Sequence, residues 1–276
     1  MNPLILIPLV LAARYHGPEI SQTDQWTEDF SFTATGSPHV VVKNVWGPIT
    51  VRTHDQPFVR VTAREKRVAR DQEMLDRSRD LLFLTVDHQP DLLRIELDGI
   101  NNERHHRDPC PGCRLEYAFE LTVPANASIE ATTVMDGAVD IAGVGNVVRA
   151  RNVNGDVYVA GLTSCNDLGT VNGELDAHFA APPMLEKCAI HTVNGDMTIV
   201  LPSGSDAEFD FDLFNGEVES DFELTALPAK PEVTRVSDGR ITRYRLRTPS
   251  AVRLGAGGPR FTFESINGDV NIVAKR

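Results

Sequence analysis

Short runs in which apolar and polar residues alternate fill much of the second half of the chain. The runs share one phrase, which reads V-N-G-D-V at residues 153–157, V-N-G-E-L at 171–175, V-N-G-D-M at 193–197, F-N-G-E-V at 214–218 and I-N-G-D-V at 266–270. Alternation with a period of two predicts strands with one face turned inward. Each Asn-Gly pair is typical of a turn, because glycine adopts a positive φ easily and asparagine tolerates it.

The spacing of these turns decides between two arrangements, a two-residue hairpin and the corner of a stacked coil. Positions 136, 154, 172, 194 and 215 give steps of 18, 18, 22 and 21 residues, and the flanking apolar and acidic residues return together. This repetition favours stacked corners, whose asparagine side chains are expected to hydrogen-bond along the stack. The predicted turn residues are Asn154, Gly155, Asn172, Gly173, Asn194, Gly195, Asn215, Gly216, Asn267 and Gly268.

The pattern therefore predicts an all-β protein with two regions. Residues 130–276 are expected to form a single-stranded parallel β-solenoid (β-helix), with an inserted hairpin at 228–250. Residues 26–129 are expected to form an N-terminal β region. Within it, charged helix formers predict one amphipathic helix over 64–82, and residues 101–114 form a polar loop that holds two cysteines.

The first 25 residues have the character of a signal or of a disordered N-terminus. An apolar run from Leu4 to Ala13 is too short to span a bilayer and predicts an export signal, with Val10 and Ala12 at positions that suit cleavage. The alternative is a disordered or strand-forming apolar tail. No other stretch has the ~18 apolar residues of a membrane helix. We expect an exported protein, periplasmic or on the cell surface, without a transmembrane span.

Composition narrows the range of partners. The formal net charge is -12 and the isoelectric point is near 5.1. Phosphate backbones of nucleic acids are repelled by such a surface on average, so a nucleic-acid partner is not expected.

The acidic residues themselves follow the repeat. One stands directly after each turn glycine and alternates with the inward apolar residues, which predicts an outward row of carboxylates. Such a row could hold cations or a cationic partner, or it could be a solvated surface that keeps exposed sheet edges apart. The residues of the row are Asp156, Glu174, Asp196, Glu217 and Asp269, and a second outward row comprises Asp140, Asp176 and Glu219.

The four cysteines fall into two pairs. In H-H-R-D-P-C-P-G-C, the metal ligands His105, His106, Cys110 and Cys113 could hold a zinc ion, although a fourth ligand is not evident because adjacent histidines point apart on an extended chain. A local disulfide, a redox pair or two idle thiols are the alternatives.

The other two cysteines, Cys165 and Cys188, precede Asn172 and Asn194 by 7 and 6 residues, which places them at nearly the same point of consecutive coils. Neighbouring strands lie about 4.8 Å apart, which is within reach of a disulfide. Two buried thiols are the alternative.

Motifs of enzymes are not found. The sequence lacks a G-x-S-x-G elbow, an H-E-x-x-H pair, a phosphate loop and a dinucleotide fingerprint. His178 and His191 are single histidines at outward strand positions, which is typical of a surface. We therefore predict that the protein is not an enzyme, with a carbohydrate-active β-helix enzyme as a less favoured alternative.

Several of these features together resemble a known family. The serial corners, W-G-P-I-T-V-R-T followed by a charged helix, R-L-E-Y-A-F-E-L-T-V-P-A-N-A before the coils, and the late G-A-G-G are similar to the bacterial "putative adhesin" family of β-solenoid domains of unknown function. The similarity covers roughly residues 40–276. It implies an exported or envelope-associated, non-enzymatic protein built of stacked coils, and the family motif carries no catalytic or binding residues.

The resulting hypothesis is an adhesin-like module that acts as a structural or interaction surface at the bacterial cell envelope. Its partner would be an envelope protein or a glycan, with self-association through the ends of the solenoid as a further expectation. No cofactor is expected, except for zinc if the alternative of a metal-binding protein holds.

Overall fold

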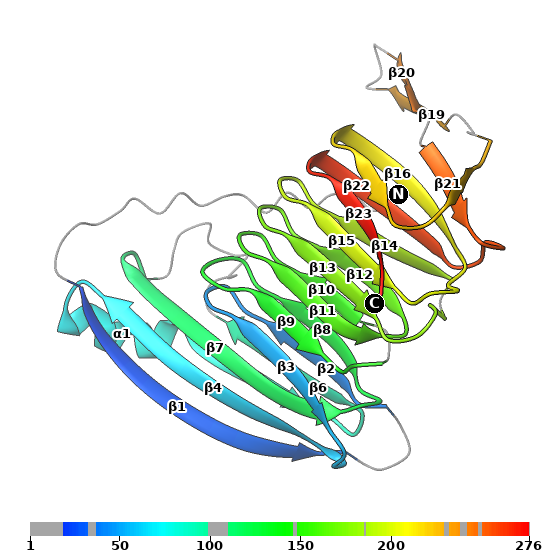
Figure 1. The fold of residues 1–276 in the computed structure, drawn as a ribbon. Helices are drawn as coiled ribbons and strands as arrows, with labels where there is room; N and C mark the ends of the chain where they lie inside the picture. Colours follow the sequence, from blue (N-terminus) through cyan, green and yellow to red (C-terminus); the bar gives the residue numbers. More distant parts are fainter. Residues whose placement is uncertain are drawn as a thin grey trace.

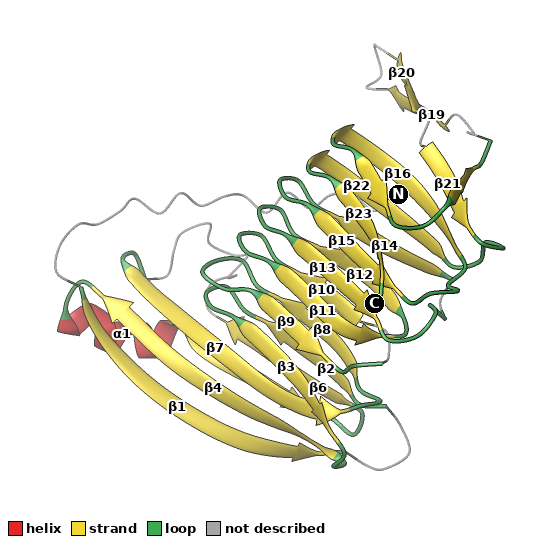
Figure 2. Ribbon diagram, in the orientation of Figure 1, coloured by secondary structure: helices red, strands yellow, loops and turns green. Residues whose placement is uncertain are grey.

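The computed structural model describes residues 19–32, 37–98, 110–145, 148–184, 186–228, 232–237, 242–247 and 250–275. Within these residues the chain consists mostly of strands, with one helix, α1 (Gln72–Leu81) (Figures 1 and 2). Two large sheets enclose a single hydrophobic core. The prediction of an all-β protein is confirmed.

The first large sheet, called sheet A here, has ten strands. In spatial order they are β1 (Ile20–Ser31), β4 (Phe58–Ala69), β7 (Cys113–Pro124), β3 (Ile49–His54), β9 (Val139–Ala142), β11 (Val157–Leu162), β13 (Leu175–Phe179), β15 (Met197–Leu201), β23 (Val270–Ala274) and β17 (Val218–Ser220).

The second large sheet, sheet B, has eleven strands. In spatial order they are β18 (Leu224–Ala226), β21 (Ser250–Leu254), β16 (Ala207–Asn215), β22 (Arg260–Asn267), β14 (Lys187–His191), β12 (Cys165–Gly169), β10 (Val148–Arg151), β8 (Ser128–Thr132), β2 (His39–Lys43), β6 (Leu92–Asp98) and β5 (Phe83–His88). The strands β19 (Glu232–Ser237) and β20 (Thr242–Arg247) pair antiparallel in a small sheet of their own. They lie in the segment predicted as an inserted hairpin, whose turn at 238–241 is outside the described residues.

In the middle of the molecule the chain alternates between the two sheets. One strand of sheet B, a corner and one strand of sheet A make a unit that we call a rung, and the rungs are β2/β3, β8/β9, β10/β11, β12/β13, β14/β15, β22/β23 and β16/β17. Neighbouring rungs pair in parallel in sheet B. They also pair in parallel in sheet A.

The rungs do not stack in chain order. The rung β22/β23, which is last in the sequence, lies between β14/β15 and β16/β17. The corner at Asn267 is therefore bridged to Asn194 on one side and paired with Asn215 on the other.

The predicted single-stranded parallel β-solenoid is not confirmed, because both large sheets are mixed. At one end β1, β4 and β7 pair antiparallel in sheet A and β5 pairs antiparallel with β6 in sheet B. At the other end β21 pairs antiparallel with both β16 and β18. Strands that reverse therefore terminate the parallel stack.

The predicted helix over 64–82 is wrong at its start. Residues up to Ala69 belong to β4, which pairs along its whole length with β1 on one side and with β7 over most of it on the other. Two ladders of backbone hydrogen bonds outweigh the helix propensity of the charged residues there. The helix begins only after Asp71, whose side chain accepts a hydrogen bond from the backbone nitrogen of Met74 as an N-cap.

Apolar side chains fill the space between the sheets in files that run along the stack. In sheet A one file consists of Val139, Val157, Leu175, Met197 and Val270, which are all buried and paired in register. Burial of a side chain of this kind stabilises the fold by roughly 1.5–3 kcal/mol. A single rung exposes both of its faces, so the files are buried only when rungs stack.

No helix among the described residues is long and apolar enough to cross a membrane. The N-terminal segment predicted to be signal-like or disordered covers residues 1–25. Residues 1–18, which include the apolar run, lie outside the described residues, so the export signal stays a prediction. Residues 20–25 belong to β1, so the assignment of disorder is wrong for them.

Candidate functional site

The candidate site is the corner of the stack, where the predicted Asn-Gly turns lie one above another. Four of the five asparagines donate a hydrogen bond from Nδ2 to Oδ1 of the neighbouring asparagine: Asn172 to Asn154 at 2.9 Å, Asn194 to Asn172 at 2.8 Å, Asn267 to Asn194 at 2.8 Å and Asn215 to Asn267 at 3.0 Å. The amides of the three inner rungs thus both donate and accept within the ladder. They hold the corner in one conformation.

The glycine that follows each asparagine is required by close approach of the next rung. At Gly195, which has a φ of 138°, an added Cβ would lie 2.0 Å from the carbonyl oxygen of Gly173. Such a contact cannot be relieved by a side-chain movement, because the obstacle is backbone. Glycine therefore sets the spacing of the corners.

The five predicted acidic residues of the first row are all exposed at this corner. Three of them also hold the next rung: Oδ1 of Asp156 accepts from the backbone nitrogen of Glu174 at 2.9 Å, Oδ1 of Asp196 from Asp269 at 2.9 Å, and Oδ1 of Asp269 from Glu217 at 2.8 Å. One carboxylate oxygen of each aspartate is thus engaged in the stack. The arrangement leaves a line of carboxylate groups facing solvent.

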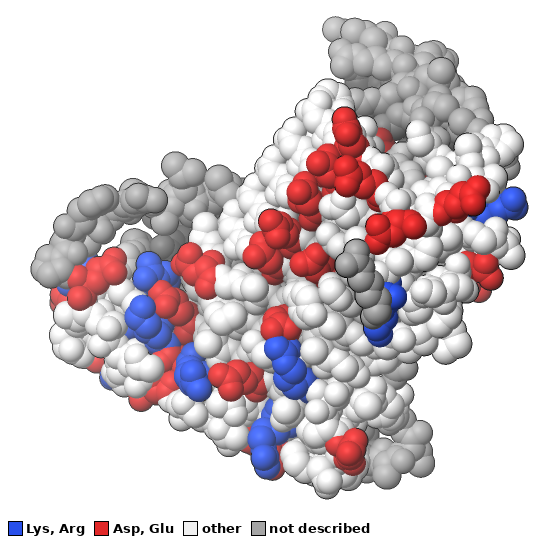
Figure 3. Space-filling view, in the orientation of Figure 1, with Lys and Arg blue, Asp and Glu red and all other residues white. Residues whose placement is uncertain are grey.

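On the face shown in Figure 3, acidic side chains gather over the upper part of the stack, whereas most lysines and arginines lie lower, toward β1, β3 and β4. Exposed carboxylates at the spacing of strands, about 4.8 Å, raise the local negative potential. The corner can therefore attract cationic groups.

The second predicted row is interrupted. Register places Tyr158 between Asp140 and Asp176 on neighbouring strands of sheet A. Asp140 also forms a two-pronged ion pair with Arg52, at 2.9 Å to Oδ1 and 2.5 Å to Oδ2, and this hydrogen bonding raises the pKa of Arg52. The ring of Tyr158 lies 5.2 Å from that of His178. This row is a mixed surface and not a continuous line of carboxylates.

The structure joins Cys165 to Cys188 in a disulfide between β12 and β14, on consecutive rungs, and joins Cys110 to Cys113. In this oxidised form the sulfurs of Cys110 and Cys113 are not thiolate ligands. The other two proposed zinc ligands, His105 and His106, lie outside the described residues. Among the described residues, no group of three or more histidine, cysteine or acidic side chains is arranged to hold a metal ion. Zinc binding stays a prediction.

A charged cluster on the outer face of sheet B is not predicted by the sequence pattern. Arg151 donates a hydrogen bond to Oδ2 of Asp167, and Nε of Arg149 lies 3.7 Å from the same oxygen. Nδ1 of His191 lies 3.6 Å from Oδ1 of Asp167. The imidazole lies across Gly169, where a Cβ would come within 2.1 Å of Nε2. Burial lowers the pKa of His191, and the nearby Asp167 carboxylate opposes this shift. A glycine at the strand position beside His191 is the one signal of this packing in the sequence.

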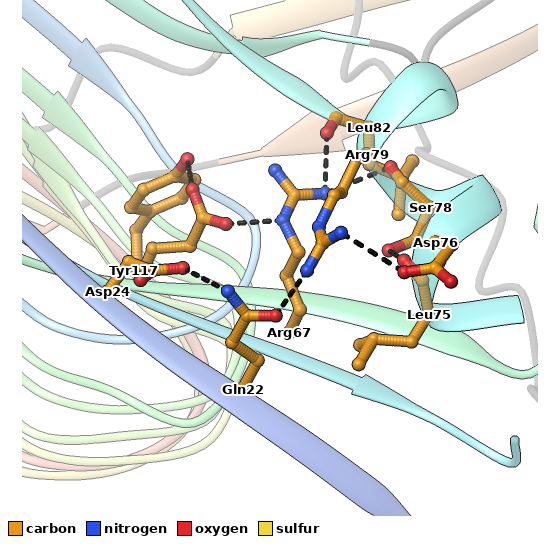
Figure 4. Close-up of polar contacts among 10 residues, drawn as sticks. Gln22, Asp24, Arg67, Leu75, Asp76, Ser78, Arg79, Leu82 and Tyr117 are labelled. Carbon is orange, nitrogen blue, oxygen red and sulfur yellow. Dashed lines mark hydrogen bonds and ion pairs between the residues drawn. The ribbon is translucent and has the colours of Figure 1, made fainter. Parts of the chain in front are cut away.

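A second missed cluster lies under α1 (Figure 4). Arg67, which is buried, donates from a terminal guanidinium nitrogen to the carbonyl oxygens of Ser78 and Leu82, at 2.9 Å each, and from Nε to Glu65. The hydroxyl of Tyr117 donates to the same carboxylate, and burial raises the pKa of this tyrosine far above its ordinary value. The cluster ties the C-terminal end of the helix to sheet A.

Comparisons with known proteins add little to this geometry. No family model matches the chain, and no curated protein matches it. Two solved structures resemble it at low identity. A "putative cell adhesion protein" from Clostridium sporogenes is 9% identical, with 92% of this chain and 100% of that chain covered and a TM-score of 0.43. A "putative adhesin" from Bacteroides fragilis is 10% identical, with 91% and 97% covered and a TM-score of 0.31. Likeness at this level assigns no function to the chain.

Proposed function

We propose that the protein is a non-catalytic, adhesin-like module, exported to the periplasm or surface of a bacterium, in which a two-sheet β-solenoid presents an interaction surface at the cell envelope. One observation carries the proposal. The asparagines of the corner are engaged in holding neighbouring rungs, while the five acidic side chains beside them face solvent in register. A repeated group on a rigid edge suits recognition of a repeating partner, whereas catalysis needs different groups that converge on one point.

The chemistry of the row indicates what the partner carries. A single exposed ion pair contributes about 0–1 kcal/mol, so one contact would not suffice. Five carboxylates on one rigid edge can act together, and the ladder orders them before binding, which reduces the entropy lost on association. The partner is therefore expected to carry several positive charges, as an amine-bearing glycan or a basic envelope protein does. Binding of this kind weakens as salt is added.

The two disulfides support an oxidising location. Such bonds persist in the periplasm and outside the cell and are rare in the cytosol. The Cys165–Cys188 bond joins consecutive rungs, so it would keep the corner in register after export.

The experiment is co-sedimentation of the purified chain with a bacterial envelope fraction. In the test variant the row is neutralised by D156N, D196N, D269N, E174Q and E217Q. Asparagine keeps the oxygen that accepts the hydrogen bond from the next rung, so the stack is retained while the charge is lost. The control neutralises five exposed acids elsewhere, by D24N, E28Q, D55N, E73Q and D91N.

We expect the row variant to bind the envelope fraction at least about tenfold more weakly, and the control to bind as the wild type does, since both have the same net charge. An equal loss of binding in both variants would show that net charge alone, and not the row, determines binding. Absence of binding by the wild type would contradict the proposal.

A further inference from the structure

The two sheets do not end together at the far end of the stack. Beyond the rung β16/β17, sheet B continues with β21 and β18, whereas sheet A ends at β17 among the described strands. At the opposite end both sheets continue beyond the rung β2/β3, with β7, β4 and β1 in sheet A and β6 and β5 in sheet B. The inner faces of β21 and β18 therefore extend past the edge of sheet A, and we call the region formed by β17, β18 and β21 the open end.

The edge strand β17 offers backbone groups for pairing. The carbonyl of Glu217 accepts from Val270, and the backbone nitrogen of Asp221 donates to Ile272, so these residues face the neighbouring strand β23. Successive residues of a strand direct their backbone groups to opposite sides. The N–H and C=O groups of Val218 and Ser220 consequently face away from β23, and no described strand pairs with them.

Apolar side chains surround this edge. Phe214 is 80% exposed at the last corner, and Val218 is 39% exposed on β17. Leu213, Phe222, Leu224 and Val252 are only partly buried against the end of the core. A strand added beside β17 would cover these apolar side chains. Without such a strand they stay in contact with water.

Charge determines which strand can be added. Residues 206–224, which include the edge, contain eight aspartates and glutamates and no lysine, arginine or histidine. The following segment, 229–249, has six lysines and arginines against two acidic residues. Its strand β20 reads T-R-Y-R-L-R, in which arginine alternates with other residues. Among the described strands, β20 pairs with β19 alone.

We propose that β20 of one copy of the chain pairs with the β17 edge of a second copy. The strands β19 and β20 project from the same end of the stack as β17 (Figure 1), so donor and acceptor lie together in each molecule. The exchange is therefore reciprocal, and it closes at a dimer joined end to end instead of forming a fibre. Direct pairing of two β17 edges would set Glu217 and Glu219 against their own copies, which is unfavourable. The proposal does not depend on the acidic corner binding an envelope component.

The test uses two complementary charge variants of the full chain. The first, E217K with E219K, reverses the acceptor edge, and the second, R243E with R245E, reverses the donor strand. Each variant alone sets like charges together and is expected to weaken self-association about tenfold or more, as measured by sedimentation or light scattering over a range of concentrations. A mixture of the two restores opposite charges at both contacts, so a mixed dimer is expected.

The control variant, E28K with E73K, changes the net charge as the acceptor variant does, at exposed positions far from the open end. It should dimerise as the wild type does. A further variant, V218P, removes one outward N–H that β23 does not use and is expected to weaken the dimer while thermal stability stays near that of the wild type.

Three results would overturn the proposal. These are a wild type that stays monomeric at all concentrations, charge variants that each dimerise as strongly as the wild type, and a mixture of the variants that stays monomeric. If the mixture stays monomeric while a single chain that carries both charge reversals regains the stability lost in each variant, that combination would indicate that β20 pairs with the β17 edge of its own molecule.

Discussion

The two ends of the stack solve the same problem in different ways. At the first end, long antiparallel strands and α1 cover the terminal rung, and the buried Arg67 joins the helix to the sheet. At the open end β17 has only three residues, all exposed, and its surroundings are strongly acidic. A row of unpaired backbone groups invites unwanted pairing, which proteins prevent by covering an edge or by charging it. At the open end this chain uses charge, whereas at the first end the added strands move the edge of sheet A from the terminal rung to β1.

The largest expected effect comes from breaking the covered end. The substitution Arg67→Ala leaves Glu65, whose side chain is only 15% exposed, without its cation and removes two hydrogen bonds to the last turn of α1. Loss of one partner of a buried pair costs about 3–5 kcal/mol. Urea unfolding should show this decrease in the free energy of unfolding.

The matched control is Arg64→Ala on the same strand, whose guanidinium and its partner Glu120 are each 56% exposed. Its expected cost is below about 1 kcal/mol. Similar losses for the two arginines would show that the buried network does not hold the covered end.

The next largest loss of stability is expected from removing the disulfides, one of which lies in the stack and the other at the loop before β7. Cys165 and Cys188 are 23 residues apart, and Cys110 and Cys113 are 3 apart. A crosslink that closes a longer loop restricts the unfolded chain more, so alanine at both positions should cost about 3 kcal/mol for the first pair and about 2 kcal/mol for the second. Thermal unfolding without reductant measures the difference. The reverse order would contradict this account.

Substitutions in the asparagine ladder allow its contribution to stability in the middle of the stack to be compared with that at the open end. Asn172 makes two hydrogen bonds within the ladder, and Asn215, in the terminal rung, donates one. At about 1 kcal/mol for each net hydrogen bond, Asn172→Ala should cost about 2 kcal/mol and Asn215→Ala about 1 kcal/mol. Equal costs in urea unfolding would mean that the ladder contributes no more in the middle than at the end.

The smallest expected effect is the change in stability with pH that His191 causes on the outer face of sheet B, between the two ends. The pKa of His191 is lowered in the folded protein, mainly by burial, so the unfolded state takes up its proton first as the pH falls below about 6.5. Stability must therefore decrease on acidification through that range. Because the side chain is 36% exposed and solvent screens it, the contribution should stay below about 1 kcal/mol.

The variant Gly169→Ala tests this directly, because its Cβ displaces the imidazole toward solvent. The pKa of His191, followed by nuclear magnetic resonance, should rise toward its ordinary value. An unchanged pKa would show that contact with Gly169 is not the source of the burial.

Prediction from sequence worked best where a local rule repeats. Asn-Gly followed by an acidic residue specifies a corner within five residues, so the turns and their common register could be derived without knowledge of distant contacts. The roles suggested for the acidic row remain predictions.

Distant pairing accounts for most of what the pattern did not indicate. Residues 64–69 have the composition of a helix and form a strand because β1 and β7 flank them. Asp167 and His191 belong to different rungs, and only their register brings them together. The buried cluster of Glu65, Arg67 and Tyr117 joins segments about 50 residues apart, which no local period can reveal.

The position of the rung β22/β23 bears on how the chain is made. Its residues leave the ribosome after those of β16 and β17, yet they lie between that rung and β14/β15. Rungs emerging earlier can assemble one by one. The strands β16 and β17 have no neighbouring rung to stack on until the segment 260–274 appears, although β21 can already pair with β16. Stacking of this rung thus waits until residues 260–274 are made. A nascent chain that stalls before residue 260 leaves Phe209 and Phe211 without Phe261 and Phe263, whose rings pack against theirs, and exposes them to chaperones and proteases.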